Sequence, residues 1–190
     1  MIKKLFILCL GLLVLTGIFL ACALEDSKSP LDKAILKWSR QFDVDPLMFR
    51  AICQVESGSM ATHMKIRNDW RKLSTQQWAV DSFRTCRVKG KMINTDDGWN
   101  WASLGDSQIL YIVAVAEYGY QGTPKELMYN VQTNIKYGIW HFKTLRNRYL
   151  SNMDAISAYN SGKPRKLNGV YYNQGYVNMV MQEFSELKGE

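Results

Sequence analysis

Apolar residues recur along most of the chain at the three- and four-residue spacing of an amphipathic α-helix. This spacing predicts helices at 30–42, from 46 to a stop at Gly58, at 74–83, from 109 to 118, from 124, and at 131–149, 153–159 and 176–187. Ser29-Pro30 and Asp45-Pro46 each place a capping side chain before a proline at the first helical position. No parallel-sheet pattern and no repeat period is visible, so we expect an all-α domain.

The N-terminal segment breaks this pattern, because it is apolar almost throughout. Leu5 to Leu24 contains Thr16 as its one polar residue and follows Lys3 and Lys4. A positive start, a long apolar stretch and small residues at its end are typical of an export signal. Ala21-Cys22-Ala23 fits the cleavage site of such a signal.

Two other interpretations of this leader stay open. The apolar run is about long enough to span a bilayer, which takes roughly 20 residues. Cys22 also lies in a sequence that loosely resembles a lipoprotein box. We therefore expect residues 1–23 to be a signal peptide or a membrane or lipid anchor, and residues 24–190 to be an exported domain. The expected location is the periplasm or cell envelope.

The net charge of +7 changes little when the leader is set aside. Without Lys3 and Lys4 the chain has 22 basic and 17 acidic residues, a net charge of +5. Such a balance suits an anionic partner such as a nucleic acid, an anionic lipid or a cell-wall polymer, or is simply a solvated basic surface. Export and the lack of any nucleic-acid-binding signature argue against a nucleic acid.

Cysteine and histidine are too few for most kinds of site. Cys53 and Cys86 lie outside the leader and could form one disulfide bridge in an oxidising compartment, or could both be buried thiols. Their spacing matches no zinc motif, and no nucleotide-binding loop is present, so we expect neither a metal nor a cofactor. A lone helical histidine such as His141 is more often packed or exposed than catalytic.

Glu56 has unusual surroundings for a carboxylate. It lies in the last turn of a short, largely apolar helix and is followed by Ser57-Gly58. A carboxyl group beside apolar surface is harder to ionise and can donate a proton near neutral pH, as the acid of a glycosidic cleavage must. Considered alone, Glu56 is better explained as a surface residue near a helix end.

Several short motifs favour the catalytic interpretation of Glu56, because they follow one another in the order of a known family. They are Asp45-Pro46-Leu47, Ala51 to Gly58, Ala102 to Ile109, Asn134 to Gly138, Ala155 to Gly162 and Tyr176-Val177. This series resembles the lytic transglycosylases of the soluble, goose-type-lysozyme-like kind, with their Glu-Ser, Gly-x-x-Gln and Ala-Tyr-Asn-x-Gly motifs. The resemblance covers about four-fifths of the expected exported domain.

The resemblance implies a compact lysozyme-like fold, a peptidoglycan substrate and a set of site residues. Glu56 would be the single catalytic acid and base, with Ser57 beside it. Gln108 would line the sugar groove. Tyr159 would orient Glu56 or the N-acetyl group of the substrate, and Asn160 would shape the groove nearby.

The implied reaction breaks the β-1,4 bond between N-acetylmuramic acid and N-acetylglucosamine without adding water. It leaves a 1,6-anhydro ring on the muramic acid, and it needs no second carboxylate because one residue serves as acid and then as base. A hydrolytic muramidase on the same fold, a non-catalytic glycan-binding protein and a basic exported protein that binds membranes or partners are the rival hypotheses.

Two features depart from the family pattern. The family usually has Gly-Leu-Met-Gln where this chain has Gly105-Asp106-Ser107-Gln108, so we expect a different groove wall there. Residues 59–101 form a longer, basic, tryptophan-rich insertion, which we expect to build an extra lobe over the groove. Its tryptophans, Trp99 and Trp101 among them, would either stack on sugar rings or pack the lobe.

Overall fold

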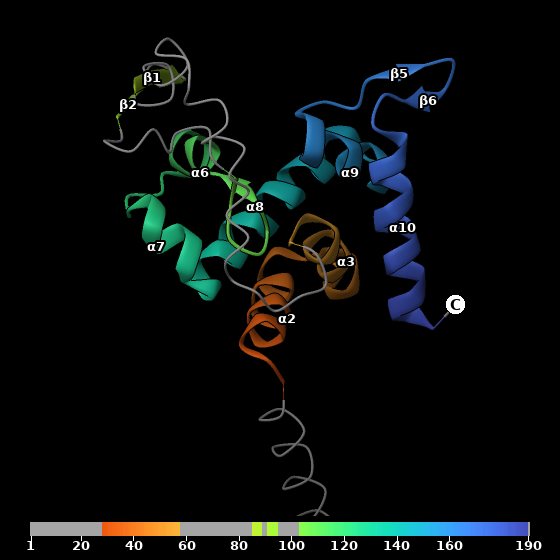
Figure 1. Ribbon diagram of the computed structural model, residues 1–190, viewed down its shortest axis with the longest axis horizontal. Coiled ribbons are helices and arrows are strands. Elements are labelled where there is room, and N and C mark those ends of the chain that lie inside the picture. Colours follow the sequence, from red (N-terminus) through yellow and green to blue (C-terminus); the bar gives the residue numbers. More distant parts are fainter. Residues whose placement is uncertain (1–27, 58–84, 89–90, 95–102, 190) are drawn as a thin grey trace, which may run out of the picture.

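The computed structural model describes residues 28–57, 85–88, 91–94 and 103–189 and is built mainly from helices (Figure 1). The helices are α2 (Pro30–Phe42), α3 (Pro46–Ser57), α6 (Tyr111–Tyr118), α7 (Pro124–Tyr129), α8 (Val131–Tyr149), α9 (Asn152–Ser161) and α10 (Gln174–Lys188). The expected all-α, lysozyme-like class is thereby confirmed. Within the described residues, no helix combines the length and the apolar character that crossing a bilayer requires.

The described strands form three short antiparallel hairpins, each of two strands. They are β1 (Thr85–Val88) with β2 (Lys91–Asn94), β3 (Ser103–Leu104) with β4 (Ile109–Leu110), and β5 (Lys166–Leu167) with β6 (Val170–Tyr171). The last hairpin lies between α9 and α10, in a segment where no helix was expected. The leader and its cleavage site, the helix expected at 74–83 and most of the 59–101 insertion lie outside the described residues.

The helices begin where the sequence places capping side chains. Ser29 Oγ accepts a hydrogen bond from the backbone N–H of Asp32, which starts α2. Thr123 Oγ1 accepts from the N–H of Glu126 at the start of α7. These side chains satisfy backbone donors that the first helical turn leaves without partners. The predicted starts at residues 30 and 124 are therefore confirmed, with their physical reason.

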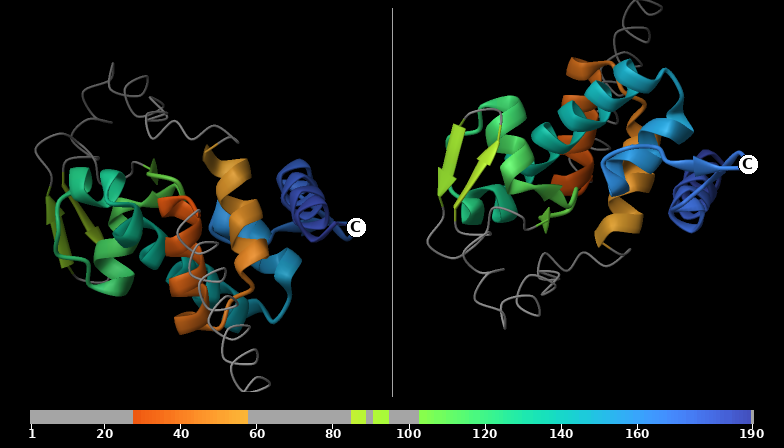
Figure 2. Two further views of the ribbon diagram at one scale, coloured as in Figure 1. Left: turned by 90° about the horizontal axis from the view of Figure 1, so that it is seen from below. Right: turned by 90° about the horizontal axis from the view of Figure 1, so that it is seen from above.

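Two apolar clusters divide the described domain, and α8 contributes to both. The larger cluster joins the buried faces of α2, α3, α8, α9 and α10. The smaller one joins α6, α7 and the β3–β4 hairpin, against which Tyr137 of α8 packs. Figure 2 shows α6 and α7 at one end of the molecule and α10 at the other, with α3 and α8 between them. The boundary between the clusters is thus a natural position for a groove.

A buried amide holds the β3–β4 turn in place at this boundary. Asn134, in α8, has no exposed surface. Its Nδ2 donates to the carbonyl oxygens of Leu104 at 2.7 Å and Leu127 at 3.1 Å, and its Oδ1 accepts from the N–H of Ser107 at 2.9 Å. One side chain therefore ties the turn, α7 and α8 together, and it is fully satisfied although it is buried.

The polar Ser107 is part of the same packing and does not face the groove. It is fully buried, and its hydroxyl donates to the backbone carbonyl of Asn134 at 3.3 Å. It also packs directly on Gly138, where a Cβ would overlap it. At Ser107, the departure from the family pattern is therefore accommodated in the interior, and the expectation that this residue alters the groove wall is wrong.

We expect Gly105→Ala to destabilise the domain by about 2–4 kcal/mol. Gly105 has φ +67°, which costs an alanine about 1–2 kcal/mol, and a Cβ there would overlap the Asn134 amide. Moving that amide would break buried hydrogen bonds, each loss costing about 1–3 kcal/mol. Urea denaturation followed by circular dichroism measures the free energy of unfolding.

Gly119→Ala is the matched control for this change. Gly119 has φ +69°, and no described atom lies within 4 Å of the position that its Cβ would take. It should therefore show the backbone cost alone, about 1–2 kcal/mol. Equal losses in the two variants would contradict a structural role for the Asn134 amide.

Candidate active site

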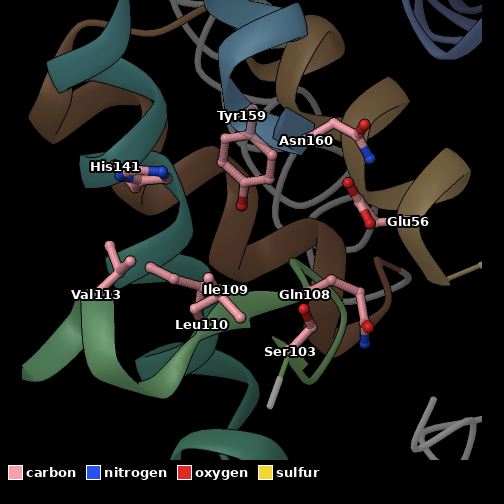
Figure 3. A pocket seen from close by; sticks show the side chains of 9 residues that line it. All are labelled: Glu56, Ser103, Gln108, Ile109, Leu110, Val113, His141, Tyr159 and Asn160. Carbon is pink, nitrogen blue, oxygen red and sulfur yellow. The ribbon is translucent and has the colours of Figure 1, made fainter. Parts of the chain in front are cut away.

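A cavity of about 190 Å³ opens between the two clusters, beside the β3–β4 hairpin. Figure 3 shows the side chains that line it. They are Glu56, Ser103, Gln108, Ile109, Leu110, Val113, His141, Tyr159 and Asn160. The structure thus brings together four of the five predicted site residues, which come from α3, the β3–β4 hairpin and α9.

Glu56 reaches the cavity because α3 starts and ends where the sequence indicates. Asp45 Oδ1 accepts hydrogen bonds from the N–H groups of Leu47 at 2.8 Å and Met48 at 3.3 Å, which fixes the first turn. The apolar face of α3 then packs in the larger cluster, and Glu56 in its last turn is 8% exposed. A carboxyl group therefore stands nearly buried at the wall of a cavity.

Tyr176 holds this carboxyl group. Its hydroxyl, from α10, donates to Glu56 Oε1 at 2.8 Å. Burial, and secondly the charge of the Glu56 carboxylate, raises the pKa of Tyr176 above its ordinary value, so the phenol keeps its proton and remains a donor. Sequence reasoning included Tyr176 in a motif but gave it no role, because nothing local indicates a partner 120 residues away.

Tyr159 has a different partner from the one expected. Its hydroxyl donates to the backbone carbonyl of Ser107 at 2.8 Å, and burial raises the pKa of its phenol. Its ring packs against Phe49, Phe142 and His141, with centroid distances of 6.4, 6.3 and 5.3 Å. Tyr159 therefore lines the cavity with its ring and braces the turn that carries Gln108.

Gln108 presents an amide to the cavity from a tightly held turn. Its backbone has φ +49°, its N–H bonds the Gly105 carbonyl at 3.2 Å, and its Nε2 donates to the same carbonyl at 2.7 Å. Its Oε1 is buried without a hydrogen-bond partner among the described residues. A buried acceptor without a partner is costly, so this turn carries an unsatisfied polar group next to the cavity.

The two other predicted binding residues differ in their exposure to the cavity. Asn160 lines it, is exposed, and accepts a hydrogen bond from Asn173 Nδ2 at 3.1 Å. Ser57 is not among the lining residues, and its hydroxyl donates to the carbonyl of Cys53 at 2.6 Å within α3. In this structure Ser57 therefore supports the end of the helix that carries Glu56.

Cys53 is a free, fully buried thiol in the structure, one of the two alternatives open for it. Burial, and secondly the charge of Asp106, raises the pKa of this thiol, so it behaves as an inert core group. The side chain of Cys86 lies outside the described residues, as do Trp99 and Trp101. The sugar contacts of the two tryptophans stay predictions.

His141 is a lining residue that the sequence pattern did not single out for function. Its Nδ1 lies 2.9 Å from the hydroxyl of Tyr118. Burial lowers the pKa of His141 to about 4, while Glu117 raises it and Arg148 lowers it further. The ring is therefore neutral at neutral pH, and it adds a polar group to an otherwise apolar part of the cavity wall.

The cavity combines one carboxyl group with amide, phenol and imidazole groups. Glu56 is the one carboxyl group among the lining residues that the structure describes. In the same described part of the chain, no group of three or more acidic, histidine or cysteine side chains is placed to bind a metal ion. A half-enclosed polar cavity with a nearly buried carboxyl group is suited to proton transfer to and from a glycan.

A mainly helical, lysozyme-like domain with such a cavity is suited to acting on glycan chains. Comparison with known families agrees: the model of the transglycosylase SLT domain matches residues 107–178. No curated protein and no solved structure matches the chain. The match supports the lytic transglycosylase family and a transglycosylase- or lysozyme-like activity related to peptidoglycan. It includes Gln108, Tyr159, Asn160 and Tyr176, and Glu56 lies before it.

We expect Tyr176→Phe to slow peptidoglycan cleavage about 10- to 100-fold, the value of one hydrogen bond to a charged group. Turbidity loss of purified peptidoglycan measures the rate, and circular dichroism checks the fold. Tyr172→Phe is the control, because Tyr172 is 73% exposed and close to Tyr176 in sequence. A Tyr176→Phe protein with the wild-type rate would show that this hydrogen bond has no part in the reaction.

We also expect the imidazole of His141 to titrate near pH 4, far below the usual 6.5 for histidine. NMR of the ring carbon-bound protons against pH measures this, and the chain has only one other histidine, His63, to assign. Glu117→Gln should lower the midpoint further, because it removes a negative charge that favours the imidazolium. A midpoint near 6.5 would contradict the burial of this ring.

Proposed function

We propose that this protein is a peptidoglycan lytic transglycosylase. It would cleave the β-1,4 bond between N-acetylmuramic acid and N-acetylglucosamine and leave 1,6-anhydro-N-acetylmuramic acid. The observation that carries this proposal is Glu56, the one carboxyl group among the described lining residues of a cavity whose other lining residues, except Ser103, lie in the segment that matches the SLT domain. A retaining glycosidase usually needs two carboxyl groups about 5 Å apart, whereas the lyase reaction needs one.

In the first step Glu56 acts as an acid. Its carboxyl proton passes to the glycosidic oxygen, the bond from that oxygen to C1 breaks, and the leaving sugar departs with a free hydroxyl. The carbonyl oxygen of the substrate's own N-acetyl group bonds to C1 and stabilises the developing positive charge. Glu56 stands nearly buried at the wall of the cavity, where its carboxyl group can reach the glycosidic oxygen of a bound glycan.

The second step uses the same group as a base. The Glu56 carboxylate removes the proton from the 6-hydroxyl of the muramic acid, O6 bonds to C1, and the acetamido oxygen is released. Glu56 regains its proton, and no water is consumed. Tyr176 supports both steps, because its hydrogen bond holds the carboxyl group in one orientation while the charge changes.

The remaining lining groups bind the glycan in this proposal. Gln108 lines the cavity from the β3–β4 turn, and Asn160 offers an exposed amide beside Glu56 (Figure 3). The leader at residues 1–23 would export the domain to the periplasm or cell envelope, as a cleaved signal or as an anchor. The net charge of +5 of the remaining chain would favour approach to the anionic wall.

We expect Glu56→Gln to keep its fold and to lose cleavage of purified peptidoglycan, because an amide can neither donate nor accept the transferred proton. Mass spectrometry of the digest identifies the products. Anhydro-muropeptides from the wild type would support the lyase, whereas reducing ends would show that the protein is a muramidase.

Glu186→Gln is the matched control, since Glu186 is exposed on α10 and bonds Gln182 at 3.0 Å. It should cleave at the wild-type rate. A fully active Glu56→Gln protein would overturn the assignment of Glu56. A wild type that binds peptidoglycan without cutting it would make this a glycan-binding protein.

A further inference from the structure

The cavity has two chemically different ends. Figure 3 shows Glu56, Gln108, Ser103 and Asn160 on one side, and His141 with Val113, Ile109 and Leu110 on the other, with Tyr159 between them. The first end holds the reaction that we propose. The second end is aliphatic apart from one imidazole, and the proposed reaction does not involve its residues.

The position of the imidazole is determined by Tyr118. The Tyr118 hydroxyl lies 2.9 Å from His141 Nδ1, and the two rings meet edge to face with centroids 6.0 Å apart. Burial raises the pKa of Tyr118 to about 12, although the nearby Thr144 hydroxyl lowers it, so this phenol keeps its proton. A phenol is a better donor than a neutral imidazole, and we assign the proton of this hydrogen bond to Tyr118.

The tautomer of His141 then defines which hydrogen-bonding group it presents to a ligand. A neutral imidazole has one N–H donor and one acceptor, and the acceptor here is Nδ1. Nε2 therefore carries the hydrogen, and no described residue forms a hydrogen bond with it. An N–H donor with no hydrogen-bond partner among the described residues thus lines a cavity end that is otherwise aliphatic.

An acetamido group matches these surroundings. It carries one carbonyl acceptor and one methyl group on a flat, compact frame. A sugar hydroxyl placed among Val113, Ile109 and Leu110 would be desolvated on most sides, which costs free energy without partners. A methyl group there would gain from burial instead.

Accordingly, we propose that His141, held by Tyr118, is a specificity residue that binds an acetamido group of the glycan. Nε2–H donates to the acetamido carbonyl, and the methyl group packs on Leu110 and Val113. This extends the proposed function, because it places a second sugar contact at the end of the cavity that Glu56 does not occupy. Through His141, α8 would then contribute directly to substrate specificity.

The test measures oligosaccharide binding to a variant that cannot cleave the glycan. In the Glu56→Gln background, isothermal titration compares a tetrasaccharide of N-acetylglucosamine with its de-N-acetylated counterpart. His141→Phe keeps an aromatic ring against Tyr159 but removes the N–H. We expect it to weaken binding of the acetylated ligand about three- to tenfold, the range for one hydrogen bond, and to leave the de-N-acetylated ligand unchanged.

His141→Gln is the rescue variant, because its amide can place an N–H near the position of Nε2. It should recover most of the lost affinity for the acetylated ligand. The imidazole ¹⁵N shifts of the His141-containing protein report the tautomer directly, and they should show hydrogen on Nε2 and a bound Nδ1. The Nε2 signal should move when the acetylated ligand is added.

Three results would overturn the proposal. They are equal losses for both ligands in His141→Phe, hydrogen on Nδ1 in the free protein, and an Nε2 signal that the acetylated ligand leaves unmoved. Cleavage of peptidoglycan by the protein with native Glu56 is measured in parallel. Cleavage together with any of these results refutes the role of His141 alone, whereas absence of both cleavage and glycan binding refutes the proposed function as well.

Discussion

The side-chain amide of Asn134 is the interaction on which the arrangement of the cavity depends. It joins the β3–β4 turn, α7 and α8 through hydrogen bonds made by both its oxygen and its nitrogen. A buried amide with satisfied partners is specific in a way that apolar packing is not, because its partners must lie in fixed directions. The position of Gln108, and hence one wall of the cavity, follows from this geometry.

The opposite wall depends on a contact between distant parts of the chain. Glu56 lies in the last turn of α3, and its partner Tyr176 lies near the start of α10, so the carboxyl group is oriented only when these helices pack. A reactive group held by tertiary structure is positioned by the whole fold and cannot be formed by a local segment. The match to the SLT domain family covers the Tyr176 side of this pair and stops short of Glu56.

Local signals were predictable from the sequence, and long-range partners were not. The caps at Ser29 and Thr123 and the place of Glu56 in the last turn of α3 follow from residue order alone. The β5–β6 hairpin was missed although Asn168-Gly169, both with positive φ, is a strong two-residue turn signal. The partners of Tyr159, Tyr176 and Ser107 depend on which helices meet, and no spacing rule contains that information.

The membership of α8 in both apolar clusters has a consequence for how the cavity can move. Asn134 and His141 are seven residues apart on this helix, which is two turns or about 10.5 Å. Because α8 is one continuous helix that packs in both apolar clusters, the clusters cannot separate about a hinge without breaking backbone hydrogen bonds of α8. The helical rise of α8 thus sets the distance between the turn that carries Gln108, which Asn134 holds, and the imidazole of His141.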